Sequence, residues 1–187
     1  MRVISGLRKG HKLKAPKGMD VRPTEDKIKE SLFNILRNIK NGGVALDLFS
    51  GSGSIGIEFL SRGAEMAYFI DKSAASISVI KENLAHTRLM DNAVVIQSDG
   101  IRILDYFRSK NICFDYIYLD PPFRQGDLLY RVLESISKNS ILKEDGIIVI
   151  EHEKELELDE NLYNFIKYDF RNYGSKSLSF YRKICNS

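Results

Sequence analysis

The feature that most constrains this chain is a regular alternation of short apolar runs with amphipathic segments between residues 44 and 150. Near-continuous apolar runs are typical of strands buried on both faces, and the segments between them repeat apolar residues at helical spacing. Such an alternation predicts an α/β fold with a mostly parallel sheet. We predict strands at 44–49, 66–70, 93–97, 114–119 and 146–150, and helices at 55–61, 74–87, 101–107 and 128–136.

The N-terminal end departs from this alternation. Residues 2–15 intersperse apolar and basic residues around Gly6 and Gly10, which predicts a small hairpin with a basic exposed face. A helix is predicted to follow over about 24–38, with Thr24 as its N-cap.

The C-terminal end also departs from it. Residues 165–170 and 178–181 have strand character on either side of Tyr173-Gly174, which predicts an antiparallel hairpin. The acidic segment 151–160, which lies before this hairpin, is interpreted as a solvated loop.

The charge of the chain is unevenly divided. The net charge is +3, but residues 1–40 carry eleven Lys and Arg against four Asp and Glu, a balance of +7, and the rest has a balance of −4. Basic arms commonly meet phosphates, although a solvated surface explains charge alone equally well. We therefore treat residues 1–22 as a basic extension and residues 23–187 as the main domain.

The cysteines and histidines indicate no metal site. Cys113 and Cys185 lack the spacing of metal ligands, and the three histidines lie far apart in the sequence. No apolar stretch approaches the ~18 residues of a membrane span. We expect a cytoplasmic protein without a metal.

A glycine-rich turn, Asp47–Gly56, follows the first predicted strand. Gly51 and Gly53 let a ligand approach the backbone, and ligands of open α/β sheets bind at this end of the strands. The three glycines Gly51, Gly53 and Gly56, with Asp71 about 20 residues beyond, also match the dinucleotide-binding fingerprint. An NAD-dependent oxidoreductase is therefore compatible with the spacing.

Two carboxylates favour a different cofactor. Asp47 ends the strand before the glycines, where it would repel a pyrophosphate but would suit an ammonium or sulfonium group. Asp99, followed by Gly100, comes after the third strand and can accept a hydrogen bond from an adenine amino group, or cap the next helix. Together they favour S-adenosylmethionine over NAD.

The segment Asp120-Pro121-Pro122-Phe123 directly follows the strand predicted at 114–119. The prolines donate no N–H, so the carboxylate of Asp120 and the carbonyl of Pro121 can accept both N–H groups of a substrate amine. Phe123 can stack on a base, a contact worth roughly 1–3 kcal/mol. The loop therefore predicts methylation of an exocyclic amine on a nucleic-acid base. The alternative is that Asp-Pro-Pro forms only a rigid turn and binds no ligand.

In combination these motifs resemble the RsmD family, the guanine-N2 methyltransferases of bacterial small-subunit ribosomal RNA. The resemblance runs nearly end to end, and the N-terminal elements narrow it to this family. Ser50 is a mild departure, because Ala is usual there. The matching segments are Arg2–Gly6, Lys9-Gly10, Arg22–Thr24, Leu32–Leu36, Leu46–Gly56, Ser61–Ala64, Asp120–Phe123, Tyr173-Gly174 and Leu178–Arg182.

The resemblance implies a class I methyltransferase fold, with seven strands and a final antiparallel hairpin. It also implies S-adenosylmethionine as cofactor and ribosomal RNA in an assembling small subunit as substrate, for which a monomer suffices. Adenine-N6 methylation of DNA and a non-enzymatic RNA-binding module stay open as alternatives. The predicted catalytic residues are Asp120, Pro121 and Phe123. The predicted cofactor-binding residues are Asp47, Phe49, Gly51, Gly53, Asp71, Asp99 and Gly100. The predicted RNA-binding residues are Arg2, Arg8, Lys9, Lys12, Arg22 and Thr24.

Overall fold

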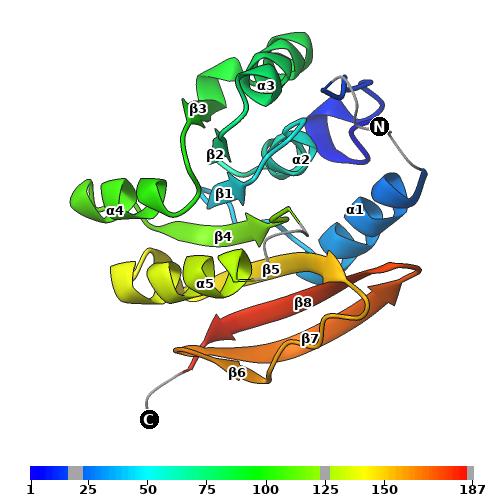
Figure 1. Ribbon diagram of the computed structural model, residues 1–187. Helices are drawn as coiled ribbons and strands as arrows, with labels where there is room; N and C mark the ends of the chain where they lie inside the picture. The colour runs from blue at the N-terminus through cyan, green and yellow to red at the C-terminus, as the bar shows by residue number, and fades with distance from the viewer. Residues whose placement is uncertain (17–22, 123–126, 185–187) are drawn as a thin grey trace. The chain divides into compact units, whose positions relative to one another are not determined.

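The computed structural model describes residues 1–16, 23–122 and 127–184, with the backbone alone at 23–25 (Figure 1). The chain divides into two compact units, Met1–Ser98 and Asp99–Ser187. Each unit has its own strands, its own helices and a buried apolar core, and each is described here by itself.

The first unit is built on a parallel sheet in the order β3-β2-β1. Helix α2 connects β1 to β2 and α3 connects β2 to β3, and both helices pack on these strands. Phe33 of α1 and Phe59 of α2 are buried in edge-to-face contact, with ring centroids 4.8 Å apart. The elements are η1 (Gly6–Arg8), α1 (Pro23–Leu36), β1 (Val44–Leu48), α2 (Ser54–Ser61), β2 (Met66–Asp71), α3 (Ala74–Thr87), η2 (Met90–Asn92) and β3 (Ala93–Gln97).

Residues 1–16 form an arm that packs against α2 of the same unit (Figure 1). Only part of the predicted hairpin forms, because its two arms are joined by a single antiparallel bridge between Arg2 and Lys12. The backbone N–H of Val3 donates to His11 O at 2.9 Å, and that of Gly10 donates to Val3 O at 2.9 Å. The chain reverses through η1 instead of a regular two-stranded ladder.

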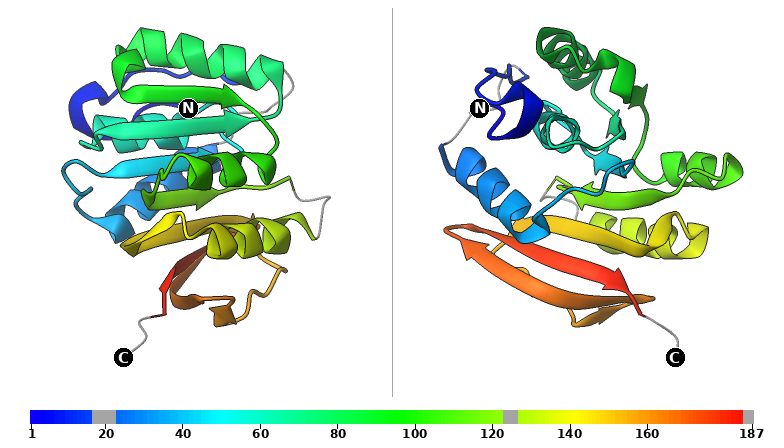
Figure 2. Two further views of the ribbon diagram at one scale, coloured as in Figure 1. Left: turned by 90° about the vertical axis from the view of Figure 1, so that its left-hand side faces the viewer. Right: turned by 180° about the vertical axis from the view of Figure 1, so that it is seen from behind.

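The second unit is built on a mixed sheet in the order β4-β5-β8-β7-β6. Strands β4 and β5 are parallel, and the remaining neighbours are antiparallel. Helices α4 and α5 lie side by side (Figure 2). The elements are α4 (Arg102–Ser109), β4 (Phe114–Leu119), α5 (Leu128–Asn139), β5 (Leu142–Glu153), β6 (Asn161–Leu162), β7 (Phe165–Tyr173) and β8 (Lys176–Lys183).

Strand β5 differs most from its prediction. It begins at Leu142, four residues early, but its pairing with β4 shifts register before Ile147. At its other end it continues through Glu151 and His152, which are buried. The interpretation of the whole segment 151–160 as a solvated loop was therefore wrong for its first residues, because they continue β5 and pair with β8, which buries Glu151 and His152.

The α/β architecture with a mostly parallel arrangement and a C-terminal antiparallel hairpin is confirmed. The described residues contain eight strands, because the two-residue β6 adds to the seven that the resemblance implies. No helix in the described part of the chain is long and apolar enough to cross a membrane.

Candidate active site

The glycine-rich turn lies between β1 and α2 in the first unit. Phe49 has a φ of 70°, Gly51 of 53° and Gly53 of 76°, so three residues of the turn are left-handed. The N–H groups of Phe49 and Ser50 both donate to Ile70 O, at 3.0 and 2.9 Å. The Ser50 hydroxyl donates to Asp47 O at 2.5 Å and accepts the N–H of Ile70 at 2.8 Å. These bonds tie the turn to the end of β2.

Two of the three glycines are explained by packing within the unit. A Cβ on Gly56 would lie 2.3 Å from the Phe69 ring, and one on Gly53 would lie 3.2 Å from Ile80 and 3.3 Å from Phe69. Close approach of α2 to β2 therefore requires glycine at position 56. The match of Gly56 to a dinucleotide fingerprint has a structural cause that involves no cofactor.

Asp47 is buried at the end of β1, with 2% of the residue exposed. Its Oδ2 accepts the backbone N–H of Gly56 in the first turn of α2 at 2.9 Å. A carboxylate at this place is stabilised by the unpaired N–H groups and the positive end of the helix dipole. Asp47 thus joins β1 to the start of α2.

Asp71 ends β2 and organises the same turn. Its Oδ2 accepts the N–H of Gly51 at 2.9 Å, and its Oδ1 accepts the N–H of Ser73 at 2.8 Å. Each carboxylate oxygen has two lone pairs, so each can accept a further hydrogen bond from a ligand hydroxyl. The structure therefore brings Asp47, Phe49, Gly51, Gly53 and Asp71 together around one turn.

Asp99 and Gly100 begin the second unit. Oδ1 of Asp99 accepts the N–H of Ile101 at 2.9 Å and that of Arg102 at 3.2 Å, so this carboxylate caps α4. Asp99 therefore caps α4, which was one of its two predicted roles. The other oxygen of the carboxylate, Oδ2, takes no part in these two bonds. Capping does not compete with an adenine contact, because a carboxylate can accept several hydrogen bonds.

Asp120 and Pro121 directly follow β4 in the second unit. All six residues of β4 are buried, whereas the Asp120 side chain is 35% exposed and Pro121 is buried. The strand therefore carries a carboxylate from the core to a solvent-accessible position. Phe123 lies outside the described residues.

Three residues that the sequence did not single out lie next to Asp120. Lys176 Nζ, at the start of β8, is 3.9 Å from Asp120 Oδ1 and also pairs with Glu151 of β5. Glu151 is buried and accepts a hydrogen bond from the hydroxyl of Tyr118 in β4. Lys176 is 56 residues from Asp120, so only the strand order could reveal this cluster.

His152 lies beside this cluster on β5 but has a separate set of partners. Its Nδ1 lies 2.8 Å from Glu153 O and its Nε2 lies 2.9 Å from the Ser179 hydroxyl. Burial is the main reason that the pKa of His152 is lowered from its ordinary value of 6.5. Within the described ranges, no group of three or more His, Cys, Asp or Glu could hold a metal ion.

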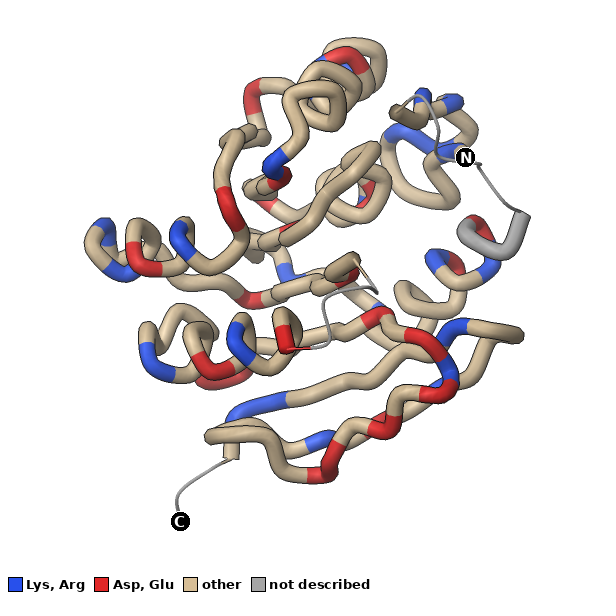
Figure 3. Tube along the Cα trace, in the orientation of Figure 1, with Lys and Arg blue, Asp and Glu red and all other residues tan. Residues whose placement is uncertain are grey.

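The predicted RNA-binding residues of the arm are largely accessible. Figure 3 shows the Lys and Arg positions of the arm in blue near the N-terminus. Arg2, Lys9 and Lys12 are exposed, while Arg8 is half-buried and donates from Nη2 to Arg88 O at 3.3 Å. Arg22 and the side chain of Thr24 lie outside the described residues.

The arm meets the end of α3, which supplies two further basic or polar groups. The rings of His11 and His86 are in edge-to-face contact, with centroids 5.5 Å apart. His86 and Arg88 are both exposed. We call Arg8, Lys9, His11, Lys12, His86 and Arg88 the basic surface.

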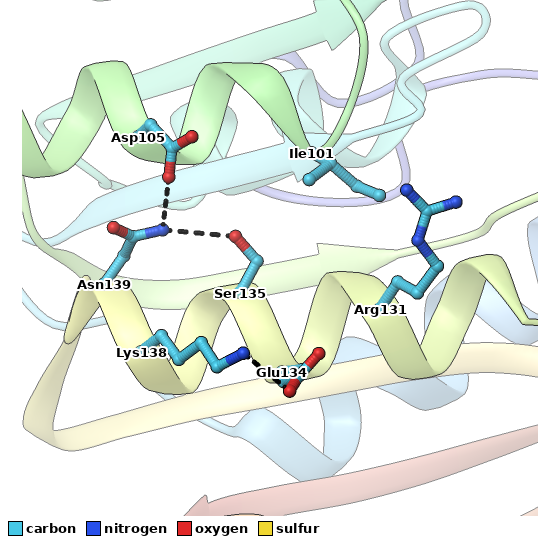
Figure 4. Close-up of a pocket in the computed structure, with 7 residues that line it drawn as sticks. All are labelled: Ile101, Asp105, Arg131, Glu134, Ser135, Lys138 and Asn139. Carbon is cyan, nitrogen blue, oxygen red and sulfur yellow. Dashed lines mark hydrogen bonds and ion pairs between the residues drawn. The ribbon is translucent and has the colours of Figure 1, made fainter.

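A polar groove of about 260 Å³ lies between α4 and α5 (Figure 4). Asn139 Nδ2 donates to Asp105 Oδ1 at 2.9 Å and to the Ser135 hydroxyl at 3.1 Å, and Lys138 pairs with Glu134 at 2.7 Å. The bond from Asn139 to Asp105 joins the two helices, and the other two lie within α5. None of the predicted site residues lines the groove, so we do not include it in the site.

The family model described as "Conserved hypothetical protein 95" matches residues 1–182. The chain is 42% identical over 98% of its length to the Bacillus subtilis protein named "Putative rRNA methyltransferase YlbH", covering 99% of that protein. It is 35% identical over 83% of its length to "Ribosomal RNA small subunit methyltransferase D" of Escherichia coli K12, covering 76% of that protein.

Solved structures share the fold. One named "Putative methyltransferase yhhF from Escherichia coli" has a TM-score of 0.84 and 29% identity, with 98% of this chain and 97% of that chain covered. A second, "SMU.776, a putative methyltransferase complexed with SAH", has a TM-score of 0.67 and 18% identity, covering 86% of this chain and 50% of that one. At that identity the second likeness concerns the fold alone.

Proposed function

The chain belongs to the family described as conserved hypothetical protein 95, the RsmD-type ribosomal RNA methyltransferases, and from this we propose that it methylates the 2-amino group of a guanine in small-subunit ribosomal RNA. The names of the relatives support ribosomal RNA as the substrate class. The choice of guanine rests on the resemblance to the RsmD family, and the methyl donor and the residue roles are our proposals from that resemblance and from the chemistry of the residues.

The observation that carries the proposal is the position of Asp120. A fully buried strand ends there, and the next residues are two prolines that donate no N–H. The lone pair of a base amine is delocalised into the ring, so the amine is a poor nucleophile. Acceptors for both of its N–H groups, the Asp120 carboxylate and the Pro121 carbonyl, would favour a tetrahedral nitrogen with its lone pair directed at the methyl donor. We propose Phe123 as the stacking partner of the base.

S-adenosylmethionine would supply a methyl group already activated as a sulfonium, so the protein needs chiefly to position the two reactants. We propose that Asp71 holds the ribose hydroxyls, since both of its oxygens are oriented by backbone N–H groups of the turn. Asp99 would accept the adenine amino group. The segment Asp47–Gly53 would bind the methionine end, where the buried Asp47 provides the negative charge.

The proton balance of the reaction involves Asp120. As the amine nitrogen forms its bond to the methyl carbon, the carbon–sulfur bond breaks and sulfur keeps the electron pair. The nitrogen must then lose one proton. We propose that the Asp120 carboxylate, as acceptor of that N–H, receives the proton or passes it to water.

We propose that the basic surface, with Arg2, Arg22 and Thr24, contacts the RNA. Its cations come from two segments, the arm and the end of α3, that hydrogen bonds and a ring contact hold together. Cations that contact phosphates should make RNA binding strongly dependent on salt. We further propose that the protein acts as a cytoplasmic monomer, without a metal, on an assembling small subunit.

The decisive experiment incubates the protein with labelled S-adenosylmethionine and small subunits that lack the modification. Label in a guanine of the RNA is the expected result, and mapping the nucleotide identifies the target. A folded protein that transfers no label would contradict the proposal. Asp120→Ala should abolish turnover while it leaves the binding of S-adenosylhomocysteine intact.

The alternatives give different outcomes in matched assays. Adenine-N6 methylation would label DNA in preference to ribosomal substrates, because the same loop can hold that amine. An NAD-dependent enzyme would bind NAD and not S-adenosylhomocysteine in calorimetric titration. A non-enzymatic RNA-binding module would bind RNA with steep salt dependence and would bind neither cofactor.

A further inference from the structure

The hydroxyl of Tyr118, the carboxylate of Glu151 and the ammonium of Lys176 form a connected chain of groups in the second unit. Tyr118 donates to Glu151 Oε2, and Lys176 Nζ donates to Glu151 Oε1. Tyr118 is 3% exposed and Glu151 is 7% exposed, so the carboxylate is held below the surface with a partner on each oxygen.

The strand register explains why Lys176 is in this place. In the β5–β8 pair, Glu153 lies opposite Lys176 and Glu151 lies opposite Leu178. Glu151 and Lys176 are therefore diagonal neighbours on one face of the sheet, within reach of a long side chain. A buried carboxylate is costly without a cation, so Glu151 fixes the position of the Lys176 ammonium.

The same ammonium faces a second carboxylate. Lys176 Nζ is 3.9 Å from Oδ1 of Asp120, whose side chain is 35% exposed, while that of Lys176 is 28% exposed. One of the two carboxylates that Lys176 meets is buried with a partner on each oxygen, and the other stands at the proposed catalytic position. The lysine thus connects a rigid anchor in the core to Asp120.

We propose that Lys176 is a positioning residue, which Glu151 and Tyr118 anchor and which orients the Asp120 carboxylate for the substrate amine. This inference rests on the proposed function. Its physical basis is that an amine is activated only when its acceptor has a defined direction, and that misplacement by about 1 Å can reduce a rate by 100-fold. Lys176 would act through Asp120 and not on the substrate itself.

The kinetic test uses the full-length protein and four variants. Lys176→Met should reduce kcat on the order of 10- to 100-fold, with the KM for S-adenosylmethionine unchanged. Lys176→Arg should restore most of the rate, because the guanidinium can also pair with both carboxylates. Lys183→Met is the matched control, since Lys183 also lies on β8 but pairs with Glu144 at 2.6 Å. It should leave kcat unchanged.

The fourth variant separates positioning from charge neutralisation. In Lys176→Met/Glu151→Gln the buried carboxylate is removed with its cation, so a purely structural lysine would no longer be needed. We expect this double variant to recover thermal stability but not kcat. Recovery of both, or a kcat of Lys176→Met within about twofold of the parent, would overturn the proposal.

A spectroscopic readout makes the test independent of turnover. The side-chain carboxyl ¹³C resonance of Asp120 should move in Lys176→Met and stay in place in Lys183→Met. An unmoved resonance in Lys176→Met overturns the positioning role, whatever the activity. If the resonance moves but the parent protein methylates neither RNA nor DNA, the proposed function fails while the link between Lys176 and Asp120 stands.

Discussion

The carboxylate of Glu58 on α2 accepts the backbone N–H of Ile4 at 2.8 Å and thereby fastens the N-terminal arm to the body of the first unit. The same carboxylate accepts the N–H of Ser5 at 2.9 Å and Nε of Arg62 at 2.8 Å. Glu58 is 0% exposed, so one buried side chain holds two adjacent peptide groups of the arm. The basic surface is therefore presented from a fixed segment.

Glu58→Ala should lower the free energy of unfolding by about 3–5 kcal/mol, because it leaves Arg62 and two N–H groups without their buried acceptor. Urea denaturation measures this change. The control is Glu82→Ala, which removes an ion pair with Lys14. The side chain of Glu82 is 51% exposed and that of Lys14 is 73% exposed, so this variant should lose about 1 kcal/mol of stability or less. Hydrogen exchange at Ile4 and Ser5 should accelerate in Glu58→Ala alone, and equal rates in both variants would show that the arm is held by other contacts.

Gly56→Ala should destabilise the protein even though it lies in a helix. Helix propensity alone predicts a gain of about 1 kcal/mol for this change. The new Cβ would lie 2.3 Å from Phe69, and overpacking of this kind costs about 1–3 kcal/mol. A thermal unfolding series with Gly56→Ala, Phe69→Leu and the double variant should show a coupling energy of at least about 1 kcal/mol. Stabilisation by Gly56→Ala would contradict the close contact between α2 and β2.

Asp71→Ala should weaken the binding of S-adenosylhomocysteine on the order of 100-fold, because the turn loses the acceptor of two N–H groups and the ligand loses its proposed ribose partner. Asp71→Asn keeps one acceptor oxygen, so its affinity should lie between those of the parent protein and of Asp71→Ala. Isothermal titration calorimetry measures both affinities. Asp91→Ala, a change of an exposed acid in η2, is the control and should bind normally. An unchanged affinity in Asp71→Ala would remove Asp71 from the cofactor site.

The buried His152 should make stability decrease as the pH falls below 6.5. Burial lowers the pKa of His152 in the folded protein, whereas the unfolded chain has the ordinary value of 6.5. Below pH 6.5 the unfolded state therefore binds more protons than the folded state, and the free energy of unfolding falls with decreasing pH.

Urea denaturation of the parent protein and of His152→Gln at pH 7 and pH 5 tests this pH dependence. The loss between the two pH values should be smaller in His152→Gln than in the parent. His86→Gln, a change at an exposed histidine, should keep the loss of the parent. The same loss in all three proteins would mean that His152 is not the group responsible.

The candidate site was predicted in the parts that are local in sequence. The residues Asp47–Gly53 and Asp71 lie at the carboxyl ends of two adjacent parallel strands, so strand order alone brings them to one turn. The structure shows Asp71 accepting the N–H of Gly51. The capping of α4 by Asp99 was an open alternative and is now observed. The catalytic, cofactor-binding and RNA-binding roles of the predicted residues stay predictions.

Hydrophobic periodicity in the sequence by itself determined the alternating strands and helices, since burial on one face or two leaves a local pattern. The pattern at Phe114–Leu119 matches β4 residue for residue. Only the tertiary structure decided that Glu58 holds Ile4 and that Lys176 meets Asp120. Those pairs are 54 and 56 residues apart, and each depends on a glutamate that packing buries, Glu58 in the first unit and Glu151 in the second. A sequence window cannot register such burial, because the same Glu or Lys reads as a surface residue until packing encloses it.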